Sequence, residues 1–279
     1  MIGQEASLVE LIESLWIPLG ICLLLAGTLV YFGIHIIARR VIFVDLALAQ
    51  LTALGAVYAE VLGWDIQEGG IEVWLCSFAA GVLGAAFFSV LGHREEKVPR
   101  EATVGIVYVV AMAATILVSM NLPHGMEHAS DLLKGSILWI SGNDLLNATY
   151  LFAGVGAFHL LFRRRMIQAS FDPDRLLQEG GKPRLWNFLF YCSFAVVVAS
   201  SVSMAGVLLV FAYLVMPAVL ATMFANTVRG RLLLGWAVGG LVSAAGLYWS
   251  YENDLPSGPT IVLALALALC LGALVRRLR

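Results

Sequence analysis

Long apolar blocks recur along the whole sequence, and they restrict the folds open to this chain more than any other feature. The block at 15–38 exceeds the about 20 residues that a helix needs to cross the hydrocarbon core of a bilayer. Only 13 % of the residues are charged, against about 25 % in soluble domains, so a water-facing surface could not be covered. The sequence therefore predicts an all-α, polytopic membrane helix bundle that forms a single transmembrane domain over 1–279.

The positions of the apolar blocks predict about eight to nine transmembrane helices. The predicted spans are 15–38, 41–63, 71–92, 102–121, 143–163, 186–201, 204–225, 231–250 and 259–276. Runs of small residues such as Gly81, Gly84 and Ala85 indicate that the helices pack closely, because helices in lipid associate through close contact of their backbones.

The basic residues predict the orientation of the bundle. With the N-terminus outside and nine spans, all but one of the 17 Lys and Arg residues fall on the cytoplasmic side, and only Lys134 lies outside. This distribution follows the positive-inside rule. We therefore expect a bacterial inner-membrane protein with its C-terminus in the cytoplasm. The predicted outer loops are acidic, and one interpretation is that they concentrate cations near the membrane. The alternative is that acidic residues are simply tolerated on that side.

Asp45 lies about one turn into the second predicted span. An ionisable side chain at that depth is costly and usually faces a transport pathway or a partner. One reading makes Asp45 a metal ligand, and the other pairs it with Arg39 or Arg40. Gln50 follows five residues later, offset by about 140° around the helix, and is the second candidate ligand in this span.

The predicted outer loop at 123–128 has the densest group of metal-capable side chains, namely His124, Glu127 and His128. Imidazole and carboxylate suit zinc and manganese, and a helix would place the three on one face. The alternative is a set of solvated loop residues. The same letters also spell H-x-x-E-H, a zinc metallopeptidase pattern, but Gly125 inside the motif opposes the stable helix that this chemistry requires.

The longest predicted cytoplasmic connection, about 164–185, contains a well-marked short helix. Asp172 can cap it, Pro173 fits its first turn, and Gly180 with Gly181 can end it. Such a helix either docks a soluble partner or lies on the membrane surface. No P-loop sequence occurs in the chain, so ATP hydrolysis would require a separate polypeptide.

Three stretches resemble the permeases of zinc, manganese and iron ABC importers, and together they cover nearly the whole chain. They are Arg39 and Arg40 with 43–50 and Gly55, then 170–174, then 206–218 with 246–258. The last stretch contains Ser-Tyr-x-x-Asp-Leu-Pro-x-Gly, which is the most specific match. The resemblance implies a type II ABC importer permease-like fold without enzymatic activity of its own. It also identifies a coupling segment for the ATPase: Phe171, Asp172, Pro173, Asp174 and Leu176.

The chain departs from this family at the intramembrane ligands. In the register that aligns Phe43 and Gly55, Leu46 stands at the family's Asp position and Gln50 at its His position, while Asp45 replaces a Gly. Either Asp45 substitutes for the missing pair, or metal handling has moved to the loop at 124–128, or the cargo differs.

The resemblance implies an ATP-driven importer of zinc or manganese, and possible iron import. Its expected partners are an ABC ATPase, a periplasmic or extracellular metal-binding protein, a second copy of the chain and membrane lipid, with no nucleic acid. No permanently bound cofactor is expected, and the transported metal binds only transiently. The alternatives are a permease for a metal chelate such as a siderophore or cobalamin, a membrane metallopeptidase, and an ion-coupled secondary transporter.

Overall fold

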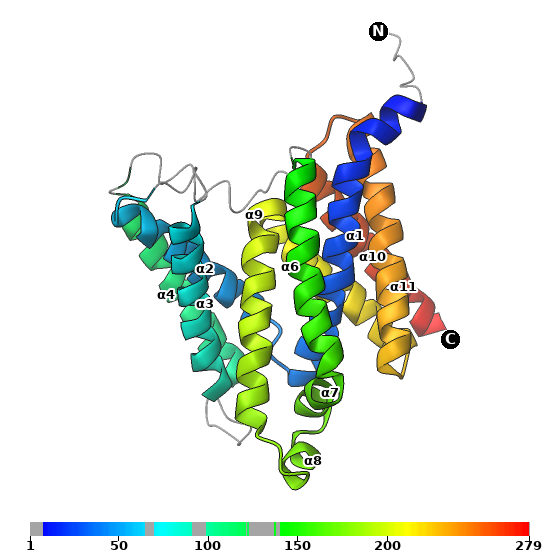
Figure 1. Ribbon diagram of the computed structural model, residues 1–279. Helices are drawn as coiled ribbons and strands as arrows, with labels where there is room; N and C mark the ends of the chain where they lie inside the picture. Colours follow the sequence, from blue (N-terminus) through cyan, green and yellow to red (C-terminus); the bar gives the residue numbers. More distant parts are fainter. Residues whose placement is uncertain are drawn as a thin grey trace.

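The computed structural model describes residues 8–64, 70–90, 99–120, 122, 137 and 140–278, with side chains described from Leu15 onward except that of Arg100. The described chain is helical throughout and contains no strand, as the sequence predicts (Figure 1). Its helices are α1 (Leu8–Arg39), α2 (Val44–Val61), α3 (Ile71–Val90), α4 (Arg100–Ser119), α6 (Gly142–Leu161), α7 (Arg163–Phe171), α8 (Pro173–Gln178), α9 (Pro183–Phe224), α10 (Val228–Glu252) and α11 (Ser257–Leu278).

Seven of the described helices are each long and apolar enough to cross a membrane, and α6 with α7 forms an eighth candidate span, bent by 78° between the two. The 42 residues of α9 would measure about 63 Å as a straight helix, twice the thickness of a hydrocarbon core. The helix is interrupted at Gly206, which has φ 76° and ψ 156°, a conformation almost restricted to glycine.

The break at Gly206 turns α9 into two spans. Figure 1 shows the chain rising along the first arm, 183–205, and returning along the second, 207–224. The sequence predicts two spans here but places the boundary at 202–203, and that position is wrong. Ser200, Ser201 and Ser203 precede the reversal, but a single glycine supplies the required backbone conformation.

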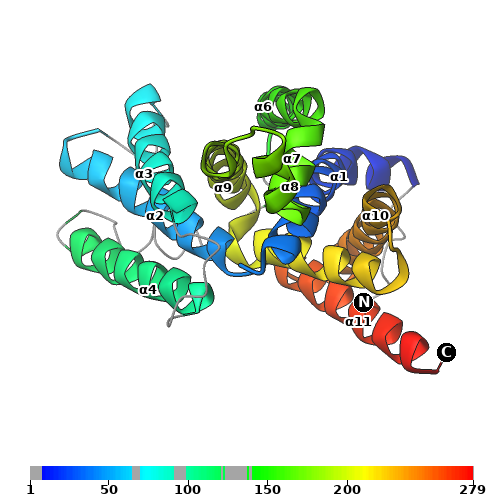
Figure 2. The same ribbon diagram turned by 90° about the horizontal axis from the view of Figure 1, so that it is seen from below.

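The helices form two groups joined by α9. Figure 2, seen from below, places α2, α3 and α4 on one side and α1, α6, α10 and α11 on the other. Contacts of α9 extend to α2 and α3 in the first group and to α1, α10 and α11 in the second. The short helices α7 and α8 lie at one end of the bundle, the end that the orientation rule assigns to the cytoplasm (Figure 1).

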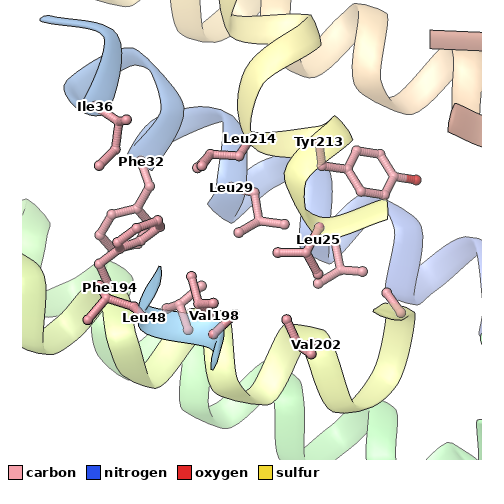
Figure 3. Packing of buried hydrophobic residues seen from close by; sticks show 14 of the residues in the cluster. Leu25, Leu29, Phe32, Ile36, Leu48, Phe194, Val198, Val202, Tyr213 and Leu214 are labelled. Atoms are coloured by element: carbon pink, nitrogen blue, oxygen red, sulfur yellow. The ribbon is translucent and has the colours of Figure 1, made fainter. Parts of the chain in front are cut away.

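One face of α1 forms the centre of the apolar core. Its residues Leu25, Leu29, Phe32 and Ile36 follow helical spacing and are fully or almost fully buried. Figure 3 shows them facing the two arms of α9, with Phe194, Val198 and Val202 on the first and Tyr213 and Leu214 on the second, and Leu48 of α2 completing the cluster. Because α1 packs against both arms, it fixes the shape of the reversal at Gly206.

Two glycines allow backbones to approach more closely than any side chain would permit. A Cβ atom at Gly33 would overlap the Leu214 carbonyl oxygen and stand 2.9 Å from its carbonyl carbon. At Gly55 a Cβ atom would lie 2.5 Å from the carbonyl oxygen of Cys76 on α3. Since apolar burial gives little net drive in lipid, such close packing is a principal source of helix association.

Candidate functional site

Asp45 lies in the first turn of α2 and is 1 % exposed. The helix has no side-chain cap, so the partial positive charge of its N-terminal amides is available to this carboxylate. Its Oδ1 atom is buried without a hydrogen-bond partner among the described residues. A buried carboxylate with an uncommitted oxygen is a group that a cation could complete, because unpaired buried polar atoms are costly.

Arg39 does not neutralise Asp45. Its Nε atom donates to Ser170 Oγ at 3.0 Å, and its Nη1 atom donates to Asn187 Oδ1 at 2.5 Å. The guanidinium carbon also lies 3.9 Å from the ring centroid of Phe190. Among the ion pairs between described residues, none includes Asp45. The pairing with Arg39 considered from the sequence is therefore not formed.

Gln50 faces a different neighbour from Asp45. Its Nε2 atom donates to Thr115 Oγ1 on α4 at 3.2 Å, and Thr115 in turn donates to the Ala111 carbonyl. The side chain therefore links α2 to α4. Its carbonyl oxygen is the only atom of the amide that could act as a metal ligand. A neutral, hard oxygen of this kind is a weak metal ligand.

His124, Glu127 and His128 lie outside the described residues, so their placement is not established and the metal role of this loop stays a prediction. Within the described part of the chain, no group of three or more His, Cys, Asp or Glu side chains comes together as a metal site. On the described residues, Asp45 is thus an isolated ligand candidate rather than part of a closed site.

A cavity of about 310 Å³ lies between α2, α3 and the first arm of α9. Its lining is mainly small and apolar, with hydroxyls from Thr52, Ser77, Ser200 and Ser203. Residues 49, 52, 53 and 56 of α2 contribute one helical face to it. Asp45 and Gln50 do not line this cavity, which therefore lacks a charged ligand.

A buried polar cluster connects α1 to the helices at the cytoplasmic end. His35 Nδ1 lies 2.8 Å from Ser170 Oγ of α7, the same hydroxyl that accepts the hydrogen bond from Arg39. One turn away, Tyr31 Oη lies 3.0 Å from His159 Nδ1 of α6. His159 Nε2 in turn lies 2.8 Å from the hydroxyl of Ser193 on α9. We call this set, together with Asn187, the α1–α7 cluster.

The α1–α7 cluster escaped the sequence analysis except for Arg39. The available signal was the spacing of Tyr31, His35 and Arg39, which puts three polar groups on one face of an apolar helix. Polar side chains on a transmembrane helix usually face a functional interior. In three of these hydrogen bonds the partner on α6, α7 or α9 lies 128 to 148 residues further along the chain. A single sequence does not reveal pairings at such separations.

The coupling segment has the local structure that the sequence predicts. Asp172 accepts a hydrogen bond from the Arg175 amide at 3.1 Å and so caps α8, and Pro173 occupies its first turn. Gly180 has φ 74°, and the Gly181 amide donates to the Leu176 carbonyl at 2.9 Å, which ends the helix in a Schellman motif.

The predicted coupling residues divide into two kinds. Leu176 is fully buried and anchors α8 to the rest of the protein. Phe171 is 38 % exposed, and its ring centroid lies 5.7 Å from that of His35 in the α1–α7 cluster. Asp172 and Asp174 are exposed. The segment is thus anchored on one side and presents polar groups on the other.

Glu179 holds the coupling segment together. Gln168 Nε2 donates to its carboxylate at 3.0 Å and Arg175 Nε at 3.1 Å, and Arg164 and Arg165 lie within 3.5 Å and 3.8 Å. The hydrogen bond from Gln168, then that from Arg175, hold the pKa of Glu179 below its usual range. The contribution of this carboxylate to stability is therefore present above the usual carboxyl pKa and is lost as the pH falls through the lowered value.

We expect Glu179→Gln to loosen α8 at neutral pH, because the amide keeps the shape but loses the charge that gathers the arginines. Hydrogen exchange of the α8 amides, corrected for intrinsic rates, should increase several-fold at pH 7 relative to the wild-type protein. As the pH falls through the lowered pKa of Glu179, the carboxylate becomes neutral and the difference between the two proteins should disappear. Equal protection at pH 7 would contradict the role assigned to this carboxylate.

Comparison with known proteins agrees with this architecture. The ABC 3 transport family matches residues 14–276. The manganese transport system membrane protein MntC of Halalkalibacterium halodurans is 25 % identical over 235 residues, covering 83 % of this chain and 76 % of that protein. The manganese import system permease protein ScaB of Streptococcus gordonii is 24 % identical over 239 residues, covering 84 % and 81 %.

The fold is also similar to that of a solved structure. The structure of PsaBC from Streptococcus pneumoniae in complex with Fab superposes with a TM-score of 0.79 at 20 % identity, covering 95 % of this chain and 94 % of that one. Since the family match spans almost all of the described bundle, including Asp45 and the coupling segment, this chain belongs to the ABC 3 transport family.

Proposed function

We propose that this chain is the permease subunit of an ATP-driven importer for a divalent transition metal, with manganese the first candidate and zinc and iron next. The family match over residues 14–276 carries this proposal. Manganese comes first because MntC and ScaB, two similar proteins, are both named for manganese transport. A chain of this kind forms the membrane passage, and ATP is hydrolysed on a separate ATPase.

The proposed assembly contains two copies of this chain, two ATPase subunits and a binding protein on the outer side. The N-terminus lies outside and the C-terminus in the cytoplasm of a bacterial inner membrane, because this orientation places nearly all basic residues inside. The ATPases dock on α7 and α8, where Asp172, Asp174 and the arginines around Glu179 offer charged groups at the surface.

Asp45 is the proposed ligand within the membrane. It is buried and has one uncommitted oxygen, and its carboxylate is a donor that suits manganese. A single carboxylate gives weak binding, which favours release of the ion during each cycle. The loop at 124–128 remains the proposed outer receiving site, and Gln50 a secondary oxygen donor. The metal is cargo and binds transiently.

Movement of the ATPases would reach the membrane helices through the α1–α7 cluster. When ATP binding closes the ATPase dimer, α7 and α8 are displaced with it. Ser170 of α7 is held by both His35 and Arg39 of α1, and Arg39 also binds Asn187 at the start of α9. The displacement therefore acts on α1 and on the first arm of α9 together, which alternates access between the two sides of the membrane.

Uptake into vesicles tests the proposal. Vesicles containing the permease and its ATPase should accumulate radiolabelled Mn²⁺ when ATP is supplied, and unlabelled Mn²⁺ should compete. Omitting the ATPase, or replacing ATP with a non-hydrolysable analogue, should abolish accumulation. Accumulation of an iron siderophore or of cobalamin, without accumulation of free Mn²⁺ or Zn²⁺, would instead establish a chelate permease. Accumulation without the ATPase would establish a secondary transporter.

A further inference from the structure

A second cavity, of about 430 Å³, opens on the other side of α1, between α6 and α10. Its contribution from α6 is one continuous helical face: Phe152, Val155, Gly156, His159 and Leu160. Arg163, the first residue of α7, continues the lining beyond the bend between the two helices. The lining from α1 and α10 is also mainly apolar. Both α6 and α10 pack against α1, which Figure 2 shows between them, and Gly27, Thr28, Tyr31 and Phe32 of α1 line this groove.

The groove extends over most of one bilayer leaflet. From Phe152 to Leu160 the face of α6 rises about 12 Å at 1.5 Å per residue, and half of a 30 Å hydrocarbon core is about 15 Å. A Cβ atom added at Gly27 or Gly156 would meet nothing within 4 Å, so the groove has open space along its length. A groove of this length can hold most of the part of one acyl chain that lies in a leaflet.

The end of the groove at the cytoplasmic side is basic. Arg163 and Arg229 both line it, and both are exposed. Neither arginine takes part in an ion pair between described residues, whereas Arg164, Arg165 and Arg175 all surround Glu179. Arg229 also lies in the first turn of α10, where the helix dipole favours an anion.

Trp236 closes the deeper part of the groove. Its indole Nε1 atom donates to the Gly27 carbonyl at 2.8 Å, which fixes the ring across the space between α10 and α1 while leaving it 42 % exposed. A tryptophan held in this way presents an apolar face to whatever lies in the groove.

We propose that this groove is a binding site for an anionic phospholipid of the inner leaflet. Its phosphate would lie between Arg163 and Arg229, and one acyl chain would extend along α6 past Gly156. Two arginines that form no ion pair with a described residue lie at the end of an apolar groove that spans most of a leaflet, and these features match both parts of such a lipid. Basic pockets between transmembrane helices on the cytoplasmic side bind anionic lipid head groups. The site is independent of the cargo of the pathway.

The bound lipid would contact the joint between a membrane span and the coupling segment. Ile167 of α7 also lines the groove, just beyond the 78° bend that separates α7 from α6. Tyr31 and His159 of the α1–α7 cluster form part of the wall. A lipid bound in the groove should therefore stabilise the bent arrangement of α6 and α7.

Native mass spectrometry of the full chain tests the site, with dioleoyl phosphatidylglycerol compared with dioleoyl phosphatidylcholine. The wild-type protein should bind phosphatidylglycerol at least fivefold more tightly. Arg163→Gln with Arg229→Gln should reduce this preference to about one. The matched pair Arg276→Gln with Arg277→Gln removes the same charge at the end of α11 and should leave the preference unchanged.

Substitution of glycines on α6 tests whether an acyl chain lies in the groove. Gly156→Leu fills the groove and should remove one tightly bound phosphatidylglycerol. Gly154→Leu, on the same helix and equally open but outside the lining, should not. Phosphatidylglycerol with brominated acyl chains should quench a fluorescence component that Trp236→Phe removes.

Three results would overturn the proposal: equal affinity for the two lipids in the wild-type protein, a preference that survives loss of both groove arginines, or loss of preference in the Arg276 and Arg277 pair. Glycerol phosphate at the same concentration distinguishes a lipid from a free anion. If it competes with phosphatidylglycerol at equal affinity, the groove binds an anion and not an acyl chain. Each variant is compared after it elutes as a single folded species.

Discussion

Gly33→Ala is expected to lower the thermal stability of the protein by about 10 °C or more. The added methyl group would overlap the carbonyl of Leu214, so the backbones of α1 and the second arm of α9 would have to separate. Overpacking a well-filled interior costs about 1–3 kcal/mol, and the obstacle here is backbone rather than a flexible side chain. About 3 kcal/mol corresponds to roughly 10 °C for a chain of this size. Fluorescence-detected unfolding in detergent measures the change.

Gly27→Ala is the control for this prediction. It lies on the same helix, and a Cβ atom there meets nothing within 4 Å. In a helix interior alanine is favoured over glycine by about 1 kcal/mol, so this variant should be as stable as the wild-type protein or slightly more stable. If Gly33→Ala were as stable as Gly27→Ala, the close approach of α1 and α9 would not contribute to stability.

Asp45→Asn is expected to reduce ATP-driven manganese uptake at least tenfold while leaving assembly with the ATPase intact. Asparagine has almost the same shape and can occupy the first turn of α2, but it cannot offer the negative oxygen that suits a divalent ion, and the described residues form no cluster of three or more His, Cys, Asp or Glu side chains that could replace it. Uptake of radiolabelled Mn²⁺, measured in vesicles of matched protein content, gives the result. Basal ATP hydrolysis should persist, because Asp45 forms no ion pair with a described residue of α7 or α8.

Two further variants separate the possible ligand sites. Glu252→Gln removes an exposed acid at the end of α10 and should leave uptake near the wild-type rate. His124→Ala with His128→Ala tests the outer loop. If uptake survived in Asp45→Asn but failed in the histidine pair, cation handling would belong to 124–128. If uptake were unchanged in both, neither ligand assignment would stand and the chelate reading would become the first candidate.

The features that the sequence predicts well are those determined by neighbouring residues. The cap at Asp172 and the stop at Gly180 depend on contacts within one helical turn, and both are confirmed. The number of spans also follows from local hydropathy. The break in α9 is misplaced by a few residues because hydropathy locates the polar serines at 200, 201 and 203, whereas the positive φ occurs at Gly206.

The α1–α7 cluster depends on tertiary contacts that one sequence does not contain. Arg39 could be expected to pair with Asp45, six residues away, yet it binds Ser170 and Asn187 on distant helices. Arg39 instead has two uncharged partners and a ring centroid at 3.9 Å, and cation–π contact is strong where water is excluded. As a result, Asp45 remains free of any described basic partner.

Arg39 carries a fixed positive charge that no described carboxylate balances, and it lies on the proposed path from α7 to α1. A divalent cation brought to about 6 Å from it would be repelled by about 5.5 kcal/mol at an effective dielectric constant of about 20. The proposed mechanical linkage would therefore repel divalent cations, so it could shift and repack during each cycle without becoming a leak for the imported ions.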